Sequence, residues 1–221
     1  YSGVRPGDSS QQGDVKIGKG SDITFATLDP LQHGCQSAVL SEGKLKGVSS
    51  RGNFGYFQPA TLYASSGKLY AEFKVSGSGE IIGVLPKGAD ISSSRTYLGS
   101  EKGKGTGLYM GGSLTLIFNY NNSGGISRRS SLGTFNRGDV LGLLLDLDDS
   151  GGKVYAYKNG TIINAGRPLN TYNLKDVASE WTFCVGNNTP WTVHCNFGQD
   201  PTFSGKEAST ENYDDEGIGN F

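Results

Sequence analysis

The sequence is poor in the residues that most often bind metals or act as catalysts, with two histidines and three cysteines among 221 residues. An odd and low cysteine count argues against a disulfide framework. Cys35, Cys184 and Cys195 are therefore expected to be free, buried thiols that pack as small hydrophobic groups. With only His33 and His194, neither of which lies in a motif, a Ser-His-Asp triad has few ways to assemble.

Neither sign of charge is in excess, because 20 Lys and Arg residues face 21 Asp and Glu residues and leave a formal net charge of −1. A chain so balanced has no long-range field that would hold a polyanion, so nucleic-acid binding is not expected. No apolar run approaches the roughly 20 residues that span a bilayer, and no signal-peptide pattern is present, so we expect no membrane insertion. The chain starts at Tyr1 without an initiator Met, from which we expect either processing or a segment of a longer protein.

Metal and cofactor motifs are incomplete. Residues 146–151 begin like a calcium loop, but the twelfth position is Tyr157, where a bidentate carboxylate is required. Zinc usually takes paired ligands such as CxxC, whereas His194 and Cys195 are adjacent and would point to opposite faces of a strand. The glycines within 103–107 lack the spacing and the strand–helix context of a phosphate loop. We predict no metal and no cofactor.

Catalytic motifs are missing as well, since the sequence has no G-x-S-x-G elbow and no S-x-x-K. Two carboxylates that flank a sugar stay open as an alternative, because Glu72, Glu80, Asp139 and Asp146 could meet in space. Acidic side chains that point outward from strands are usually solvated, however. We therefore predict that the protein is not an enzyme.

What the sequence does contain is typical of an all-β protein. Glycine supplies 35 residues, Tyr 11 and Phe 10, which fits strands joined by many tight turns. Residues 68–75 (KLYAEFKV) place Leu69, Ala71, Phe73 and Val75 on one face, the period of a half-buried strand. The apolar share of 35% indicates a thin core, such as lies between two packed sheets.

Turn signals join these strands into hairpins. Asn159-Gly160 is the strongest of them, because both residues tolerate the positive φ of a type I′ turn, and residues 148–152 (DDSGG) mark another. A third hairpin is expected between the last two strands, and Leu116 and Phe118 share one face of their strand. The expected strands cover residues 68–75, 80–85, 113–120, 139–147, 153–158, 161–163, 181–186 and 191–197.

This succession of strands predicts an antiparallel two-sheet β-sandwich over residues 23–203, with only one short helical turn at 173–179. Residues 1–22 are polar and rich in Gly and Ser, and are expected to form an N-terminal arm or linker. Residues 204–221 are acidic and interrupted by glycines, and are expected to form an extension that continues in a longer chain.

Aromatic and arginine side chains near polar loops are the candidates for a binding site, because Tyr, Trp and Arg dominate the binding energy of protein interfaces. They are expected at loops or strand ends, and comprise Arg95, Tyr97, Tyr109, Tyr120, Arg128, Tyr172 and Trp191. The alternative interpretation is that each of them caps the core or shields a sheet edge.

Five segments in order resemble the motifs of SPRY domains, namely SGKLYAEF (66–73), IGV (82–84), RGDVLG with LDLD (137–148), VYAYKNG (154–160) and NFGQDP (196–201). Leu69 replaces the usual Trp of the first motif, and Cys195 stands where Val is common. SPRY domains are concanavalin-like sandwiches that present loops at one end to a protein or peptide. The resemblance covers about residues 40–203, and implies a jelly-roll sandwich that binds a partner and does not catalyse a reaction.

The flanking segments FATLDPL (25–31) and VLSEGKL (39–45), together with residues 212–221, resemble those of SPRY-bearing structural proteins of tailed bacteriophages. This part of the resemblance implies a module of the virion, present in many copies as a homo-oligomer. Its rim loops would dock to another virion protein, or to a host surface protein or glycan. Two alternatives stay open: a cellular SPRY adaptor that captures a peptide or protein, and a carbohydrate-binding or carbohydrate-active sandwich.

Overall fold

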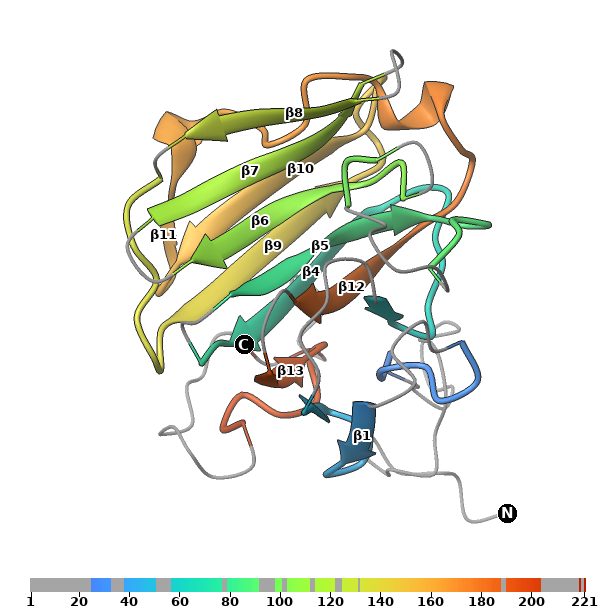
Figure 1. Cartoon of the computed structure of the whole chain (residues 1–221). Helices are drawn as coiled ribbons and strands as arrows, with labels where there is room; N and C mark the ends of the chain where they lie inside the picture. The colour runs from blue at the N-terminus through green and yellow to red at the C-terminus, as the bar shows by residue number, and fades with distance from the viewer. Residues whose placement is uncertain are drawn as a thin grey trace, which may run out of the picture.

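The computed structural model of the chain is a β-sandwich (Figure 1). It describes residues 25–32, 38–50, 57–76, 79–91, 98–100, 103–111, 114–121, 125–130, 132–187, 190–203, 219 and 221. The strands found in these residues are β1 (Ala38–Ser41), β2 (Lys46–Ser49), β3 (Phe57–Pro59), β4 (Lys68–Lys74), β5 (Glu80–Pro86), β6 (Thr106–Gly111), β7 (Leu114–Asn121), β8 (Gly125–Ser130), β9 (Val140–Asp146), β10 (Lys153–Lys158), β11 (Thr161–Ile162), β12 (Trp181–Asn187) and β13 (Trp191–Asn196). Within the same residues the helical elements are two 3-10 turns, η1 (Asn164–Gly166) and η2 (Leu174–Asp176).

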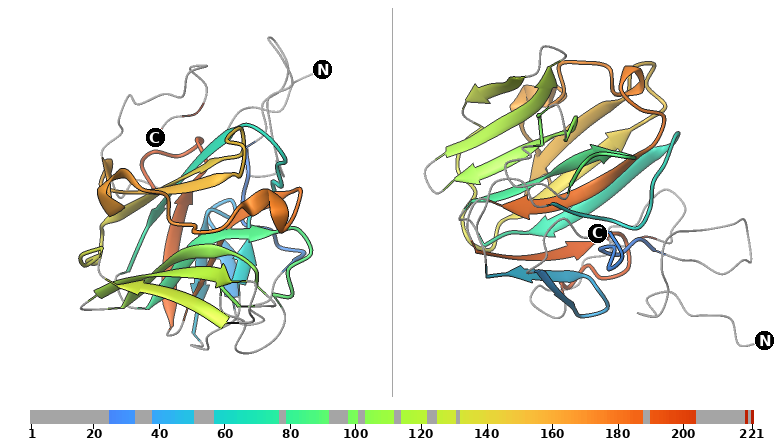
Figure 2. Two further views of the ribbon diagram at one scale, coloured as in Figure 1. Left: turned by 90° about the horizontal axis from the view of Figure 1, so that it is seen from above. Right: turned by 45° about the vertical axis from the view of Figure 1, so that its right-hand side comes forward.

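Two sheets face each other, and both are antiparallel throughout their paired strands. The seven-stranded sheet has the order β1-β2-β13-β4-β9-β10-β11, and the six-stranded sheet has the order β3-β12-β5-β6-β7-β8. Seen from above, they form two layers, with β6, β7 and β8 in one and β9 and β10 in the other (Figure 2, left). The predicted all-β sandwich is confirmed.

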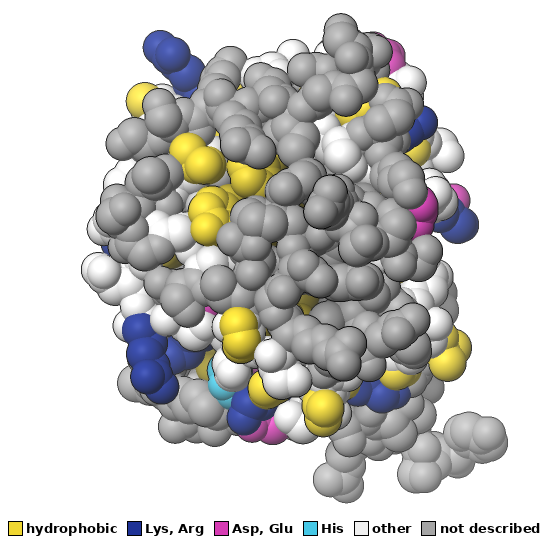
Figure 3. Space-filling model, viewed as in Figure 1, with side chains coloured by type: hydrophobic (Ala, Val, Ile, Leu, Met, Phe, Trp, Pro, Cys, Tyr) yellow, Lys and Arg dark blue, Asp and Glu magenta, His cyan; other side chains and the backbone are white. Residues whose placement is uncertain are grey.

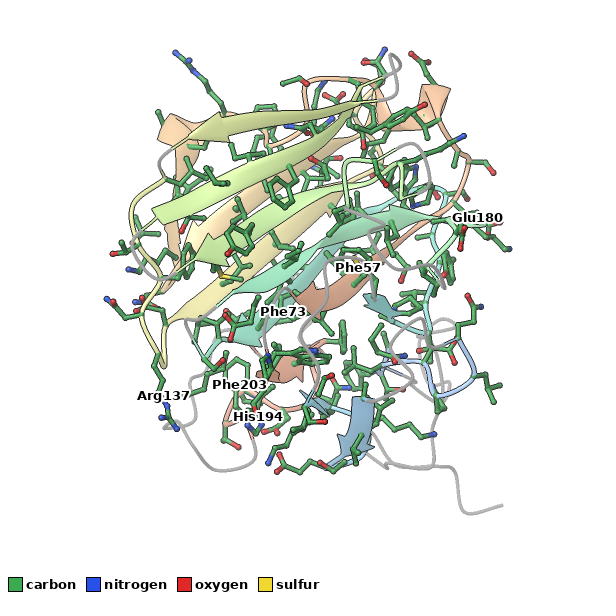
Figure 4. The ribbon with its side chains drawn as sticks, in the orientation of Figure 1. Phe57, Phe73, Arg137, Glu180, His194 and Phe203 are labelled. Atoms are coloured by element: carbon green, nitrogen blue, oxygen red, sulfur yellow. The ribbon has the colours of Figure 1, made fainter. Side chains whose placement is uncertain are left out.

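The main core lies between the two sheets. Ala71 and Phe73 of β4 are fully buried there, as the period-two alternation predicts, and Phe73 is labelled in Figure 4. The ring of Phe73 lies edge-on to Phe183 from the opposite sheet, with centroids 6.2 Å apart. Tyr70 and Glu72, which alternate with these residues, lie on the outer face of the seven-stranded sheet and are only partly buried.

The turn chemistry places two of the three expected hairpins correctly. Asn159 and Gly160 both have positive φ, 46° and 76°, and join β10 to β11 as the Asn-Gly pair predicts. β9 pairs with β10 across the DDSGG turn. The expected third hairpin is wrong, because β12 pairs with β3 and β5 in one sheet while β13 pairs with β2 and β4 in the other. The turn between them therefore changes sheets.

A second apolar cluster covers the outer face of the six-stranded sheet, where a thin single core does not predict one. Its buried members are Phe57, Ile81, Leu85, Leu98, Phe118 and Cys184. Tyr109 and Leu116 pack against it and stay half-exposed. The sandwich thus has apolar packing on both faces of one sheet.

The cysteines that the structure describes are free and buried, as expected. Cys184 belongs to the outer cluster and Cys195 to the core between the sheets, and burial raises the pKa of both thiols. Cys35 lies outside the described residues. In the part of the chain that the structure describes, no three His, Cys, Asp or Glu side chains come together as the ligands of a metal would.

The proposed arms lie mostly outside the described residues, so their boundaries stay predictions. Of the C-terminal extension, Gly219 and Phe221 are described, and both lie against the sandwich near Gly198. None of the helical segments in the described ranges has the length and apolar character that a membrane span requires.

Candidate functional site

Strand β7 positions a row of apolar side chains on the outer face of the six-stranded sheet. Because successive side chains of a strand point to opposite faces, Ile117 enters the core between the sheets, whereas Leu116, Phe118 and Tyr120 lie outside it. We call these three residues, with Tyr109 of β6 and Tyr172 of the segment after η1, the aromatic strip. All of its side chains are uncharged.

The two polar neighbours on the inner face of β7 and β6 hold the strip from beneath. Asn119 is fully buried, and its Nδ2 donates a hydrogen bond of 2.9 Å to the carbonyl oxygen of Leu169. Thr106 donates through Oγ1 to the carbonyl oxygen of Phe118 at 2.9 Å and also contacts Oδ1 of Asn119. A satisfied buried network of this kind fixes one arrangement of the backbone.

Tyr109 is a partly exposed aromatic ring on this face. Its ring stacks on Phe118 with a centroid distance of 5.8 Å and an interplanar angle of 9°. Phe118 is 2% exposed, whereas Tyr109 is half-exposed. The partner ring therefore holds Tyr109 in place while one side stays available to solvent.

Tyr120 extends the strip toward the end of the sandwich, where it meets Tyr172, a partly buried residue that also packs against the core between the sheets. Their rings meet edge to face at 5.8 Å, and the hydroxyl of Tyr172 donates a hydrogen bond of 3.0 Å to the carbonyl oxygen of Lys104. Burial, and then the proximity of Tyr120, raise the pKa of Tyr172. The phenol is therefore neutral at physiological pH and acts as a hydrogen-bond donor.

The strip is visible on the molecular surface. In Figure 3, which shows the outer face of the six-stranded sheet, hydrophobic side chains gather over β6 and β7. Elsewhere on this face Phe57 (Figure 4), Leu85 and Leu98 of the same cluster are buried. The partly exposed apolar members are Tyr109 and Leu116 on β6 and β7, and Ala89 and Ile91 after β5.

Three of the predicted site residues, Tyr109, Tyr120 and Tyr172, are brought together in this strip. Tyr120 lies near the end of β7, as expected, whereas Tyr109 lies inside β6 and not at a loop or a strand end. Tyr120 is only 7% exposed, so it supports the strip more than it offers contact area. Sequence reasoning missed Leu116 and Phe118, although their shared face was visible in the alternation of β7.

Trp191 is placed elsewhere, in the main core. It begins β13 and is 2% exposed, and its ring packs so closely over Gly47 that an added Cβ there would lie 2.6 Å from Cη2. Its side chain is therefore not available to a partner in this structure. The strand end expected at this residue is confirmed, but its indole belongs to the core and not to an exposed rim.

The arginines and Tyr97 leave part of the prediction open. Arg128 lies in β8, and its backbone pairs with Phe118 of the strip, while Arg129 pairs with Ile117. The structure does not describe their side chains. Arg95 and Tyr97 lie outside the described residues.

The four carboxylates considered for sugar hydrolysis are each engaged by close neighbours. Glu80 is fully buried and accepts a hydrogen bond from the backbone N–H of Ser76 at 3.0 Å. Asp146 lies 3.4 Å from Lys68 Nζ, and Asp139 lies 2.9 Å from Lys158 Nζ.

Burial opposes the ionisation of Asp139. The bonds from Lys158, Asn159 and the backbone of Asn136 outweigh it and lower the pKa of the carboxyl below its usual 3.8. The fourth carboxylate, Glu72, lies on the outer face of the other sheet, where burial raises its pKa. These groups are arranged as structural partners of their own turns and strands.

Comparison with known proteins shows the fold. No protein-family model matches this chain, and no curated protein matches it in sequence. Among solved structures, the SPRY domain of human HERC1 is similar with a TM-score of 0.53 and 18% identity, covering 76% of this chain and 96% of that one. The TRIM65 PSpry domain is similar with a TM-score of 0.57 and 16% identity, covering 77% of this chain and 91% of that one. The sandwich therefore has the SPRY fold.

Proposed function

We propose that this domain is a non-catalytic binding module that captures a protein partner on the aromatic strip. The observation that supports this most directly is the half-exposed pair Tyr109 and Leu116, which extends a packed apolar cluster to the surface on a rigid sheet. A rigid ring already held by its neighbour loses little conformational freedom on binding, so its contact area counts almost fully toward affinity.

The chemistry of the strip favours a partner segment with apolar or aromatic side chains. Its residues are uncharged, and three of them, Tyr109, Tyr120 and Tyr172, end in phenol hydroxyls that can form hydrogen bonds. An interface of ordinary size buries roughly 800 Å² on each partner, and hot spots cluster near its centre. Tyr109 is in the position of such a hot spot, and the neighbouring strand carries Arg128, a residue type that is also enriched there.

The test uses a peptide probe selected from a displayed library of random peptides on the immobilised domain. We expect Tyr109→Ser to weaken binding of the probe about 10-fold or more, which corresponds to about 1.4 kcal/mol. Tyr155→Ser is the matched control, because Tyr155 is a half-buried tyrosine on β10 in the other sheet. Melting temperatures of both variants verify that the fold is retained.

Probes that bind equally well to the Tyr109 and Leu116 variants, and lose affinity with Tyr155→Ser, would overturn the assignment of the strip. Glycan binding is a separate outcome of the same design. If a glycan array shows saturable binding that depends on Tyr109, and no peptide binds, the partner of the strip is a carbohydrate and not a protein.

The setting in which the module works has two candidates. The segments at 25–31 and 39–45 resemble those of bacteriophage structural proteins, which supports attachment within or from a virion, in many copies. The similarity to the SPRY domain of human HERC1 supports a cellular adaptor instead. Mass spectrometry of purified particles distinguishes the two, since a virion component co-purifies with particles at a fixed stoichiometry and an adaptor does not.

A further inference from the structure

The outer face of the seven-stranded sheet holds a second aromatic cluster, which includes the last residue of the sequence. Tyr70 of β4 lies edge-on to Phe221, with centroids 5.0 Å apart and an interplanar angle of 80°. On its other side Tyr70 lies edge-on to Tyr157 of β10 at 5.9 Å. In Figure 2 (left) the C-terminus lies on the outer side of this sheet. Tyr70 is therefore the wall against which Phe221 rests.

The sheet is shaped to take the ring of Tyr70. A Cβ added to Gly142 of β9 would lie 2.1 Å from the hydroxyl oxygen of Tyr70 and 2.9 Å from Cζ. The ring therefore lies across the neighbouring strand at a place where only a glycine leaves room for it. This fixes the face that Tyr70 offers to Phe221.

The floor beneath Phe221 is formed at Gly198. This residue has a φ of +101°, and an added Cβ would lie 3.0 Å from the Cα of Gly219, 3.0 Å from Cε1 of Phe25 and 3.3 Å from Cζ of Phe221. Three segments that are far apart in sequence thus converge within van der Waals distance at one turn. A side chain at this position would fill the space that the C-terminal segment occupies.

The turn that carries Gly198 is held independently of the C-terminal segment. Asn196 is fully buried, and its Oδ1 accepts hydrogen bonds from the backbone N–H of Gly198 at 2.8 Å and of Asp200 at 3.0 Å. Gln199 donates through Nε2 to the carbonyl oxygen of Ala26 at 2.8 Å. The turn at Gly198, which forms the floor of the slot, is therefore held by residues of the sandwich and does not need Phe221.

Tyr70 and the turn at Gly198 are connected through the carboxylate of Glu72. The hydroxyl of Tyr70 donates a hydrogen bond of 3.2 Å to Oε1 of Glu72, and Glu72 is also hydrogen-bonded to Asn196. The same Asn196 holds the turn at Gly198. The slot is a connected and preformed structure with a wall of Tyr70 and a floor of Gly198.

We propose that this slot is a docking site for the C-terminal segment of the same chain, with Phe221 as the anchor residue. The site lies on the opposite side of the sandwich from the aromatic strip, and it does not depend on the function proposed for that strip. Docking joins the C-terminal segment to the domain next to Phe25, close to where the described sandwich begins. A partner on the strip and the chain's own end on the slot are then bound at the same time.

The strength of this docking comes from tethering. A single ring and a short stretch of backbone form far less than the roughly 800 Å² per partner of a stable interface. A free peptide with the same sequence should therefore bind only in the high-micromolar to millimolar range. Attached to the chain, the segment has an effective concentration of about a millimolar or more, which keeps the slot filled.

The experiment uses the chain of residues 1–221 carrying Phe221→Ala, labelled with nitrogen-15, and a synthetic peptide of residues 211–221 as the probe. We expect saturable chemical-shift changes at the backbone amides of Tyr70, Gly142, Tyr157 and Gly198 in the variant. The unmodified chain should bind the peptide about 2- to 10-fold more weakly, because its own segment competes at an effective concentration of about a millimolar. A peptide with Ala in place of Phe221 should give no change.

Two further variants separate docking from stability. Tyr70→Leu in the Phe221→Ala background should abolish peptide binding, whereas Tyr155→Ala should leave it intact. Tyr155 is the matched control because it lies on β10, two residues from Tyr157, and makes no ring contact among the described residues. Both variants are compared by melting temperature first.

The proposal is overturned if the peptide causes no shifts in the Phe221→Ala chain, or if its shifts map to the aromatic strip. It is also overturned if light scattering shows the unmodified chain to be a dimer that Phe221→Ala converts to monomers, because the segment would then dock on a second copy. A monomer with a filled slot supports docking within one chain.

Discussion

The two outer faces of the sandwich solve the same physical problem in different ways. Each sheet buries one face in the common core and must cover its other face or make it polar. The outer face of the seven-stranded sheet carries polar pairs, such as the ion pair of Lys68 with Asp146 and the contact of His194 (Figure 4) Nδ1 with Glu42, and the ring of Phe221 lies on its aromatic part. The six-stranded sheet carries an apolar cluster that stays half-open at Tyr109 and Leu116.

This difference between the two outer faces indicates which of them can still bind a partner. On the seven-stranded sheet the aromatic slot is already filled by the chain itself. On the six-stranded sheet the strip is fixed from beneath, and its members Tyr109 and Leu116 stay partly exposed. A face that is apolar, rigid and not fully covered is the part of the surface that gains most from a partner.

The largest expected effect comes from removing the centre of the strip. Phe118→Ala deletes a fully buried ring that stacks with Tyr109, and should lower the free energy of unfolding by about 3–5 kcal/mol. Urea unfolding measures it, with Tyr155→Ala on the opposite sheet as the control at no more than about 1 kcal/mol. A loss as small as that of the control would show that the outer cluster is not packed like a core.

The matching change on the other face is Asn196→Ala. It leaves the backbone N–H groups of Gly198 and Asp200 without their acceptor and should cost about 2–3 kcal/mol in urea unfolding. The double variant with Phe118→Ala tests the separation of the faces, since independent sites add to within about 0.5 kcal/mol. Strong coupling between the two changes would contradict the distinction drawn between the faces.

A smaller loss is expected from Phe221→Ala. The ring is only partly buried against Tyr70, so its removal should cost about 1 kcal/mol in the same assay. Binding of a selected peptide to the strip should be unchanged, because the two sites lie on opposite faces. A parallel loss of strip binding would mean that the faces communicate.

The smallest effect is a dependence on pH through Glu72. Burial raises the pKa of this carboxyl above its usual 4.5, although the hydrogen bonds from Tyr70 and Asn196 act in the opposite direction. A raised pKa in the folded state means that the folded protein holds a proton that the unfolded chain has released. The contribution of Glu72 to stability is therefore greatest below pH 4.5 and is lost as the pH rises through the raised value.

Glu72→Gln removes this titration. Its melting temperature, relative to that of the unmodified protein, should rise as the pH increases from about 4 to about 7. Asp146→Asn on the same face serves as a comparison, because Asp146 is held by Lys68 at the surface. A difference that stays constant or falls over this range would be inconsistent with a buried, destabilised carboxylate.

Much of the fold was predictable because it depends on local signals. The alternation in residues 68–75 gives the correct buried face of β4, and Asn159-Gly160 gives the hairpin of β10 and β11. The turn between β12 and β13 was misread, since a turn sequence reverses the chain whether the next strand pairs with the last or enters the other sheet.

The site was predictable only in part, because local signals do not show which distant segments a strand will pack against. Alternation in β7 separates Leu116 and Phe118 from Ile117, but the inward-facing set also includes the polar residues Thr115 and Asn119, so hydropathy alone would place the wrong set between the sheets. Trp191 has the composition of a hot spot, and its burial depends on neighbours from distant strands. Nothing local to Phe221 marks its contact with Tyr70, 151 positions earlier in the chain.

The partner of this domain is proposed to bind the outer face of the six-stranded sheet. Chemical-shift mapping of a library-selected peptide on the nitrogen-15-labelled chain tests this directly. We predict that the perturbed backbone amides cluster on β6, β7 and the segment around Tyr172. A cluster on β4, β9 and β10, or at the opposite end of the sandwich, would contradict the claim.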